Sequence, residues 1–191
     1  MGTNVHIEKG GISMKKVMAL ILTGIMMFGC VGTAFGAETK VTVDGKQVSF
    51  TDAKPFVDEN GRTMVPLRSV ANAMGIHVEW DRRTKTAVFS DTYSPGIEGF
   101  GYDINGKQVY GRIVYMSLSF KVDEPKVEMF ANVEKDNGEM TMITDRFQMD
   151  TKPVVKDGRT YAPLRYMVQS FGYDVGWDGA TSTVTLTFLE W

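Results

Sequence analysis

The chain contains 191 residues, of which 43 % are hydrophobic and 23 % are charged, a composition typical of soluble globular domains and unlike that of disordered or coiled-coil proteins. Its 21 Lys and Arg residues nearly balance its 23 Asp and Glu residues, so the formal net charge is −2. This balance argues against a nucleic-acid-binding protein, which would normally carry a basic excess on one face.

The first 36 residues have the pattern of a secretory signal peptide. Lys15 and Lys16 precede an apolar run over residues 17–31, and small residues at 34 and 36 offer a signal-peptidase site. The run is shorter than the roughly 20 residues of a membrane-spanning helix, and no later segment approaches that length. We therefore expect cleavage after Gly36, a secreted protein and no membrane span, with translation starting at Met1 or Met14.

The only cysteine, Cys30, lies inside this predicted signal. Residues 27–30 (MFGC) loosely resemble the site at which bacterial lipoproteins are cleaved and lipidated, but Met and Phe fit that motif poorly. Ordinary cleavage is therefore favoured over lipid anchoring at Cys30. The mature chain would contain no cysteine, which excludes disulfides and thiolate metal sites.

Turn signals divide the rest of the chain into short strands. Six Asx-Gly dipeptides begin at residues 44, 60, 105, 137, 157 and 178, and such dipeptides supply the positive φ angles that tight hairpins need. Alternating or β-branched residues flank most of them. This pattern predicts antiparallel sheet over much of the mature chain.

Two short segments have the spacing of apolar residues that is typical of a helix. A proline stands at the start of each segment and a glycine at its end, at residues 66 and 75 and again at residues 163 and 172. The apolar positions are Leu67, Val70, Ala71 and Met74 in the first segment and Leu164, Met167, Val168 and Phe171 in the second. We expect a short helix at each place.

The two predicted helices belong to an internal duplication with a constant offset of 97 residues. The repeated set comprises Arg62, Pro66, Arg68, Trp80 and Asp81 in the first copy and Arg159, Pro163, Arg165, Trp177 and Asp178 in the second. We expect a first unit over residues 37–91 and a second over 147–191. Residues 92–146 form a central β segment, an insertion that could complete the second unit, because INGKQV at 104–109 echoes VDGKQV at 43–48.

The repeated pattern resembles the copper amine oxidase N-terminal-like domain family. The resemblance rests on the Asx-Gly-Lys hairpin, Gly-Arg-Thr, Pro-Leu-Arg and Val-x-Trp-Asp motifs, and it covers residues 41–89 and 147–188. It implies an α+β fold with two repeated units, each of antiparallel strands curled against one short helix, and the central β-rich insertion. In the oxidases this domain is a non-catalytic stalk, and such domains recur in tandem in secreted and wall-associated proteins of Gram-positive bacteria.

The residue content excludes copper amine oxidase chemistry. That chemistry needs three His ligands for copper and a Tyr that becomes a quinone, whereas His77 alone follows the signal and no Asn-Tyr dipeptide occurs. A single His on a strand is more often an exposed surface residue than a base. Asp81 and Asp178 each follow a Trp and open a turn, which favours a turn-forming role over hydrolase catalysis. We expect no enzyme activity, no cofactor and no metal site.

The repeated Arg and Trp residues leave two interpretations open. In the first, Arg68 and Trp80, with Arg165 and Trp177 in the second copy, form small cradles in which Arg holds an acidic group and Trp stacks on a sugar ring. In the second, Arg68 bridges to the Asp81 turn while Trp80 packs beneath it. We favour the structural interpretation, because a set needed to fold each unit must appear in both.

The central segment adds aromatic and Met side chains. Its aromatic residues could line a ligand groove or form the hydrophobic face of an added sheet: Phe100, Tyr102, Tyr110, Tyr115, Phe120 and Phe130. Met140 and Met142 alternate, which favours a core face filled by flexible side chains over a copper site.

These observations predict a secreted, non-enzymatic structural or interaction module at the cell surface or wall. Its partner would be a cell-wall polymer or a surface protein. The alternative is a wall-glycan or peptide-binding protein that uses Trp80, Trp177 and the central aromatic residues. A carboxylate-dependent hydrolase ranks below both.

Overall fold

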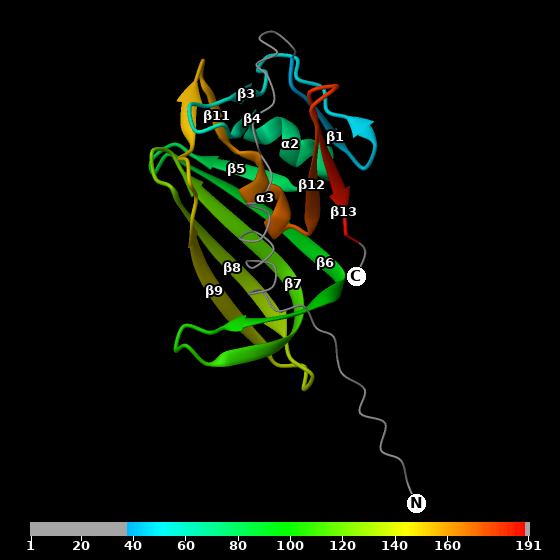
Figure 1. Cartoon of the computed structure of the whole chain (residues 1–191). Coiled ribbons are helices and arrows are strands. Elements are labelled where there is room, and N and C mark those ends of the chain that lie inside the picture. The colour runs from blue at the N-terminus through cyan, green and yellow to red at the C-terminus, as the bar shows by residue number, and fades with distance from the viewer. Residues whose placement is uncertain (1–37, 190–191) are drawn as a thin grey trace, which may run out of the picture.

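The computed structural model describes residues 38–189, apart from the side chains of Ser94 and Pro95. Strands predominate, and the described helices are the two that the sequence predicts, α2 (Leu67–Met74) and α3 (Leu164–Ser170) (Figure 1). The fold is therefore mainly β, with curled antiparallel sheets, rather than an even α+β mixture. The predicted signal peptide and Cys30 lie outside the described residues. In the part of the chain described, neither helix has the length and apolar character needed to cross a membrane.

The strands follow the duplicated order. The first copy supplies β1 (Lys40–Val43), β2 (Lys46–Gln47), β3 (Phe56–Val57), β4 (Thr63–Pro66), β5 (His77–Asp81) and the start of β6 (Thr86–Tyr102). The central segment supplies the rest of β6, β7 (Gln108–Lys121), β8 (Lys126–Glu134) and most of β9 (Met140–Gln148). The second copy supplies β10 (Val154–Lys156), β11 (Arg159–Pro163), β12 (Tyr173–Asp178) and β13 (Thr183–Phe188).

Each helix begins directly after a strand. Pro66 and Pro163 are the last residues of β4 and β11 and also the N-caps of α2 and α3, with φ near −65°, the angle that the proline ring imposes. The first helix ends at Gly75, whose φ of 74° lies in the left-handed region that glycine adopts without strain. The second ends one residue earlier in its repeat, with Phe171 as the cap and Gly172 at a φ of 84°.

The two copies share sheets. The order β12-β13-β1-β2 makes one four-stranded sheet and β10-β11-β4-β3 makes another, while β5-β6-β7-β8-β9 forms a five-stranded sheet. We name these sheets A, B and C. Strand β1 of the first copy runs parallel to β13 of the second. Sheets A and B each therefore contain strands of both copies.

Matching contacts around sheet B join equivalent residues of the two copies. In sheet B, Val65 lies opposite Ala162, the equivalent residue of the other copy. Two ion pairs cross between the copies in reciprocal fashion, Arg62 with Asp150 and Arg159 with Asp52. The equivalent residues Lys54 and Lys152 are also in ion pairs, Lys54 with Glu38 of its own copy (3.1 Å) and Lys152 with Asp123 of the central segment (3.4 Å). The duplicated Arg residues thus hold one copy to the other.

A turn at the junction adds a contact without a counterpart. The Asp58 carboxylate accepts hydrogen bonds from the backbone N–H groups of Asn60 (3.0 Å) and Arg62 (2.7 Å) within its own turn. Its other oxygen accepts from the Thr151 hydroxyl of the second copy at 2.6 Å. The turn of the β3–β4 hairpin is therefore tied directly to the segment that leads into β10.

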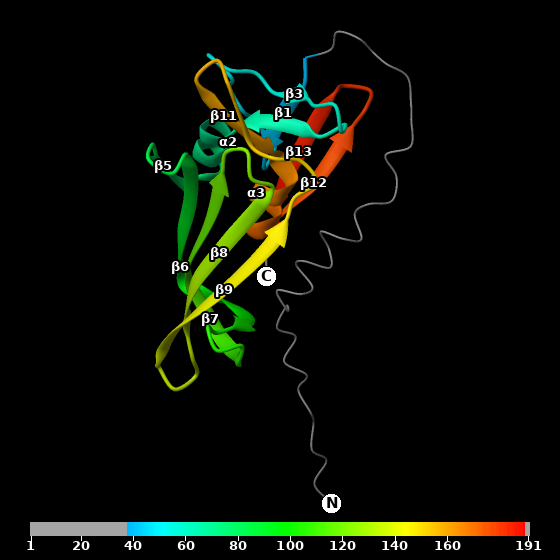
Figure 2. The ribbon, with the colours of Figure 1, turned by 90° about the vertical axis from the view of Figure 1, so that its left-hand side faces the viewer.

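Sheet C is long and extends beyond the duplicated part. Its inner face packs into the main core through side chains such as Phe89, Leu118 and Phe120, all fully buried, and α3 lies on that side (Figure 2). No described element covers the other face in that view. Residues 104–109, the echo of the opening hairpin, fall at the distal β6–β7 turn, where the Asp103 carboxylate accepts from the N–H groups of Asn105 and Lys107.

The expected core role of the alternating Met residues is wrong. Met140 and Met142 are 53 % and 47 % exposed, because the inward positions of β9 are taken by Ile143 and the half-buried Phe147. Met129, on the inner face of β8, is buried instead.

Candidate binding groove at the junction of the two copies

A surface groove of about 670 Å³ lies where both copies and the central segment meet, a volume within the usual range of ligand sites. The β5–β6 hairpin, the β7–β8 turn and strand β10 supply its walls. They contribute, in that order, Trp80, Arg82 and Lys85, then Val122 and Asp123, then Val154 and Val155. Three segments far apart in the sequence therefore build one concave surface.

The alternation of β5 places the Trp80 indole. Val78 and Trp80 point inward while their neighbours on the strand are exposed, and Trp80 lies opposite Ala87 on β6. Ala87 is small and 3 % exposed, so the large ring has room against the sheet. The indole is half-buried against the main core and also lines the groove. Trp80 thus combines the packing role and the surface role that the sequence left as alternatives.

A tight turn fixes the two basic residues beside Trp80. The Asp81 carboxylate accepts hydrogen bonds from the backbone N–H groups of Arg83 (2.8 Å) and Thr84 (3.3 Å). The pKa of Asp81 lies below its ordinary value, first because of the Thr84 hydroxyl and then because of the Arg83 N–H group. The predicted turn-forming role of Asp81 is confirmed. Lys85 closes the turn at a φ of 55°.

Backbone hydrogen bonds hold the walls of the groove together. The Lys85 carbonyl accepts from the Val122 N–H at 3.0 Å, which ties the β7–β8 turn to the hairpin of Trp80. The next residue, Asp123, donates its N–H to the Pro153 carbonyl at 2.9 Å, just before the valines of β10. The groove is therefore built on ordered backbone and not on loose side chains.

The charge of the groove is positive on balance. Arg82 and Lys85 are exposed, and neither is in an ion pair with another residue in the range 38–189. The one carboxylate of the lining, Asp123, is paired with Lys152 at 3.4 Å. Two cations are thus available to an acidic ligand.

The second copy has the same turn without these cations. Asp178 accepts from the N–H of Ala180 at 2.9 Å and from the Thr181 hydroxyl at 2.6 Å, and the Thr181 hydroxyl is the first cause of the lowered pKa of Asp178. Ser182 has a φ of 53°, close to that of its counterpart in the first copy. Trp177 is 41 % exposed. Its turn contains Gly, Ala, Thr and Ser where the first copy has Arg, Arg, Thr and Lys.

The Arg residues of the predicted cradles lie apart from the groove. Arg68 is exposed and Arg165 is half-buried, and neither is among the lining residues. No ion pair joins Arg68 to Asp81 within the described range, since the Asp81 carboxylate serves its own turn. The tryptophan and arginine members of the predicted set are therefore separated in the first copy.

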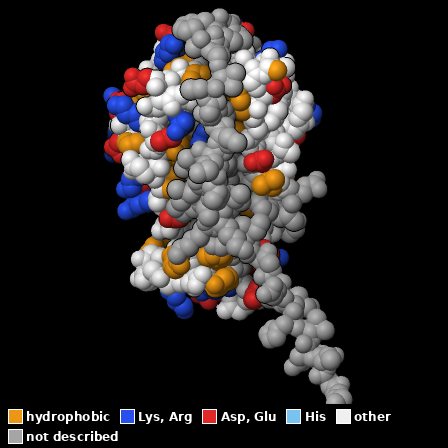
Figure 3. All heavy atoms as spheres, viewed as in Figure 1, with side chains coloured by type: hydrophobic (Ala, Val, Ile, Leu, Met, Phe, Trp, Pro, Cys, Tyr) orange, Lys and Arg blue, Asp and Glu red, His pale blue; other side chains and the backbone are white. Residues whose placement is uncertain are grey.

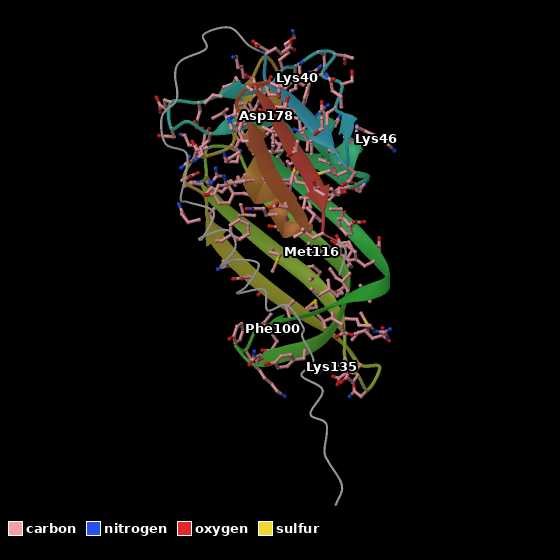
Figure 4. The ribbon with its side chains drawn as sticks, turned by 45° about the vertical axis from the view of Figure 1, so that its right-hand side comes forward. Lys40, Lys46, Phe100, Met116, Lys135 and Asp178 are labelled. Atoms are coloured by element: carbon pink, nitrogen blue, oxygen red, sulfur yellow. The ribbon has the colours of Figure 1, made fainter. Side chains whose placement is uncertain are left out.

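The central aromatic residues do not form one groove. Phe120 is buried against Phe89, with ring centroids 5.4 Å apart. Tyr115 and Phe130 pair on the outer face of sheet C at 6.2 Å. Phe100 pairs with Tyr110 in the distal hairpin, with ring centroids 5.3 Å apart. Figure 4 places Phe100 at the opposite end of the molecule from Asp178, and Figure 3 shows hydrophobic side chains gathered at this distal end.

His77 is a surface residue in the described part of the chain. The His77 side chain is 66 % exposed and lies 3.1 Å from Glu79, as predicted for a surface histidine. Across residues 38–189, no three His, Cys, Asp or Glu side chains are placed to hold a metal ion.

The repeat in the sequence points to Trp80 but not to the residues around it. Val122 and the β10 valines reach the groove only through tertiary structure, so no local signal marks them. Arg82 and Lys85 had a usable signal, because residues 82–85 (RRTK) differ in charge from residues 179–182 (GATS) within an otherwise matching turn.

Comparison with known proteins identifies a family for the chain. The sequence model of a family described as the copper amine oxidase N-terminal domain matches residues 42–95 and 141–188, which together make up just over half of the chain. The first segment spans β1 to the first half of β6, and the second spans β9 to β13. No curated protein and no solved structure matches the chain.

Proposed function

Because the chain belongs to the copper amine oxidase N-terminal domain family, a domain that is not the catalytic part of those oxidases, we propose that it is a non-catalytic binding module of the cell surface or wall. The observation that carries the proposal is the groove lined by Trp80. A half-buried indole that lines a groove beside short aliphatic walls is a surface on which a sugar ring can stack. The proposed partner is a cell-wall polymer.

The composition of the groove supports binding over a purely structural role. All three parts of the chain contribute to it, namely the first copy, the central segment and the second copy. The Val155 side chain in the wall of the groove is 52 % exposed. Because an apolar side chain stabilises the fold only as far as it is buried, this exposure contributes little to folding. A ligand that covers this valine and the indole would remove both from water.

The second candidate is a surface protein that docks on the distal hairpin. Ile104 is 74 % exposed and Tyr110 is 63 % exposed, and they lie on or beside the β6–β7 turn. Two large apolar side chains at an exposed tip can serve as anchors for a protein partner. The wall polymer remains the first candidate because the Trp80 groove is a concave surface that can orient a ligand.

Secretion is part of the proposal and has its own test. Expression of the whole chain in a Gram-positive host, followed by mass spectrometry of the medium and wall fractions, should yield a protein that begins at Ala37. Intact protein retained in the cytoplasm would contradict secretion, and a lipid-modified Cys30 would contradict ordinary cleavage.

The binding proposal is tested by retention on isolated Gram-positive cell walls. Purified protein should bind saturably, and Trp80→Ala should lower retention by about tenfold, the loss expected for one good stacking contact. Trp177→Ala is the matched control, because it removes the equivalent indole from the other copy. Circular dichroism checks that both variants fold. Absence of saturable retention, or an equal loss in both variants, would contradict the proposal.

A further inference from the structure

We infer that the ligand of the Trp80 groove is an anionic saccharide, in which a sugar ring stacks on Trp80 and an acidic group lies between Arg82 and Lys85. The inference rests on the proposed binding function and adds the chemistry of the ligand. Its observations are the charges of the groove and their absence from the second copy.

The internal duplication acts as a control for what folding requires. Asp81 and Asp178 accept the same kind of backbone hydrogen bond in the two turns, and Lys85 and Ser182 have nearly the same positive φ. The turn therefore forms with Gly179 and Ser182 as well as with Arg and Lys. Folding does not account for the two cations of the first copy.

The cations are placed to act together on a ligand. Arg82 and Lys85 line the same groove as Trp80 and have no ion-pair partner within residues 38–189. The acidic residue of the lining, Asp123, is held by Lys152 at 3.4 Å. A carboxylate or phosphate that enters the groove would thus meet two cations and one already neutralised acid.

The backbone around the groove favours a saccharide over a peptide. A peptide that adds to a sheet edge needs a run of free N–H and C=O groups. Strand β10 has only three residues, Val154–Lys156, and the preceding Pro153 carbonyl already accepts from Asp123. What the groove offers instead is the indole, aliphatic side chains and two charges, which suit a ring that carries an acid.

Attraction of an anionic ligand is confined to the groove and does not come from the net charge of the chain. The chain carries a formal net charge of −2, so the molecule as a whole does not attract polyanions. Binding of an acidic polymer should therefore depend on the two cations of the groove and not on total charge.

The test compares soluble polymers by affinity electrophoresis of the purified protein. Polygalacturonate supplies carboxylates on sugar rings, phosphomannan supplies phosphates on sugar rings, dextran is the neutral polysaccharide, and polyglutamate is an acidic peptide. We expect one of the two acidic polysaccharides to bind at least about tenfold more tightly than dextran or polyglutamate, as two charge-assisted contacts would give. The preferred polymer identifies the acidic group.

The variants replace the cations by the residues of the second copy. Arg82→Gly with Lys85→Ser should reduce this binding to the level of dextran while the protein stays folded. The control, Arg83→Ala with Lys107→Ala, removes the same charge from exposed positions outside the groove and should bind like the parent protein. Equal weakening by both double variants, unchanged binding by the groove variant, or a preference for dextran or polyglutamate would overturn the inference.

These outcomes are separate from those of the proposed function. If walls retain the protein through Trp80 but the groove double variant is retained equally well, the binding function stands and the anionic ligand is wrong. If neither the walls nor any of the polymers bind the protein, the binding function itself is wrong.

Discussion

Replacement of Val41 by Ala tests whether the two copies fold as one interlocked unit. Val41 is fully buried in β1 and lies opposite Val184 of β13. A residue of the first copy is therefore paired with a strand of the second copy in sheet A. The change removes two buried methyl groups at about 0.8 kcal/mol each, and a cavity adds to this loss. We expect the free energy of unfolding to fall by about 2–3 kcal/mol.

Urea denaturation measures this loss. With an m-value of about 2 kcal/mol/M, typical for a domain of this size, the midpoint should fall by about 1–1.5 M. Circular dichroism and tryptophan fluorescence should report the same single transition, because Trp80 and Trp177 lie in different copies that unfold together. Lys46→Ala, at an exposed position of the same hairpin, is the control and should change stability by less than about 0.5 kcal/mol. A Val41→Ala midpoint equal to that of the control, or two separate transitions, would refute the interlocked fold.

Three further predictions concern turns and close backbone contacts. Asp58→Ala should lower stability by about 1 kcal/mol more than Asp103→Ala in urea denaturation, because both lose a similar turn but only Asp58 also accepts a hydrogen bond from the other copy. Gly111→Ala should lower the thermal midpoint markedly, since a Cβ there would lie 2.3 Å from the Glu134 carbonyl oxygen at a φ of 156°; an unchanged midpoint would contradict that packing. The pKa of Asp81 is lowered in the fold. The contribution of its ionised carboxylate to the stability of the fold is therefore present above the unfolded pKa of about 4 and is lost as pH falls through the folded pKa. Asp81→Asn should therefore flatten the acid limb of the stability profile, and an identical limb in the variant would count against the turn contacts.

The local elements could be predicted from the sequence because their signals are local. Proline and glycine bracket each helix, and Asx-Gly pairs mark hairpin turns such as Asp44-Gly45, where both residues have positive φ. The balance between helix and sheet was harder to predict. Strands β6 and β7 run far past the duplicated part, so the protein is mainly β.

The exchange of strands between the copies could not be predicted from local patterns. Val41 and Val184 pair across almost the whole length of the chain, and many other partners would satisfy the same alternation of apolar residues. The ion pairs of Arg62 and Arg159 follow from this exchange. The sequence marked these residues as structural, and the contact they make depends on how the copies are arranged.

The candidate groove was predictable only in part. Trp80 stood out because it repeats, and the sequence could not decide whether it packs or binds. The half-buried position of the indole allows both. Arg68 also repeats and yet does not line the groove, whereas Arg82 does not repeat and does. Repetition therefore identifies residues that shape the fold, and a difference between copies is the better guide to a binding surface.

The most direct test of the groove is an amide and indole chemical-shift map of the isotope-labelled protein during titration with soluble wall fragments. The account predicts that the indole signal of Trp80 shifts together with the amides of Val122 and Val155, which come from three separate parts of the chain, while the indole of Trp177 does not move. Shifts confined to Trp177 or to the distal β6–β7 hairpin would contradict the central claim that the two copies and the central segment together build the binding site.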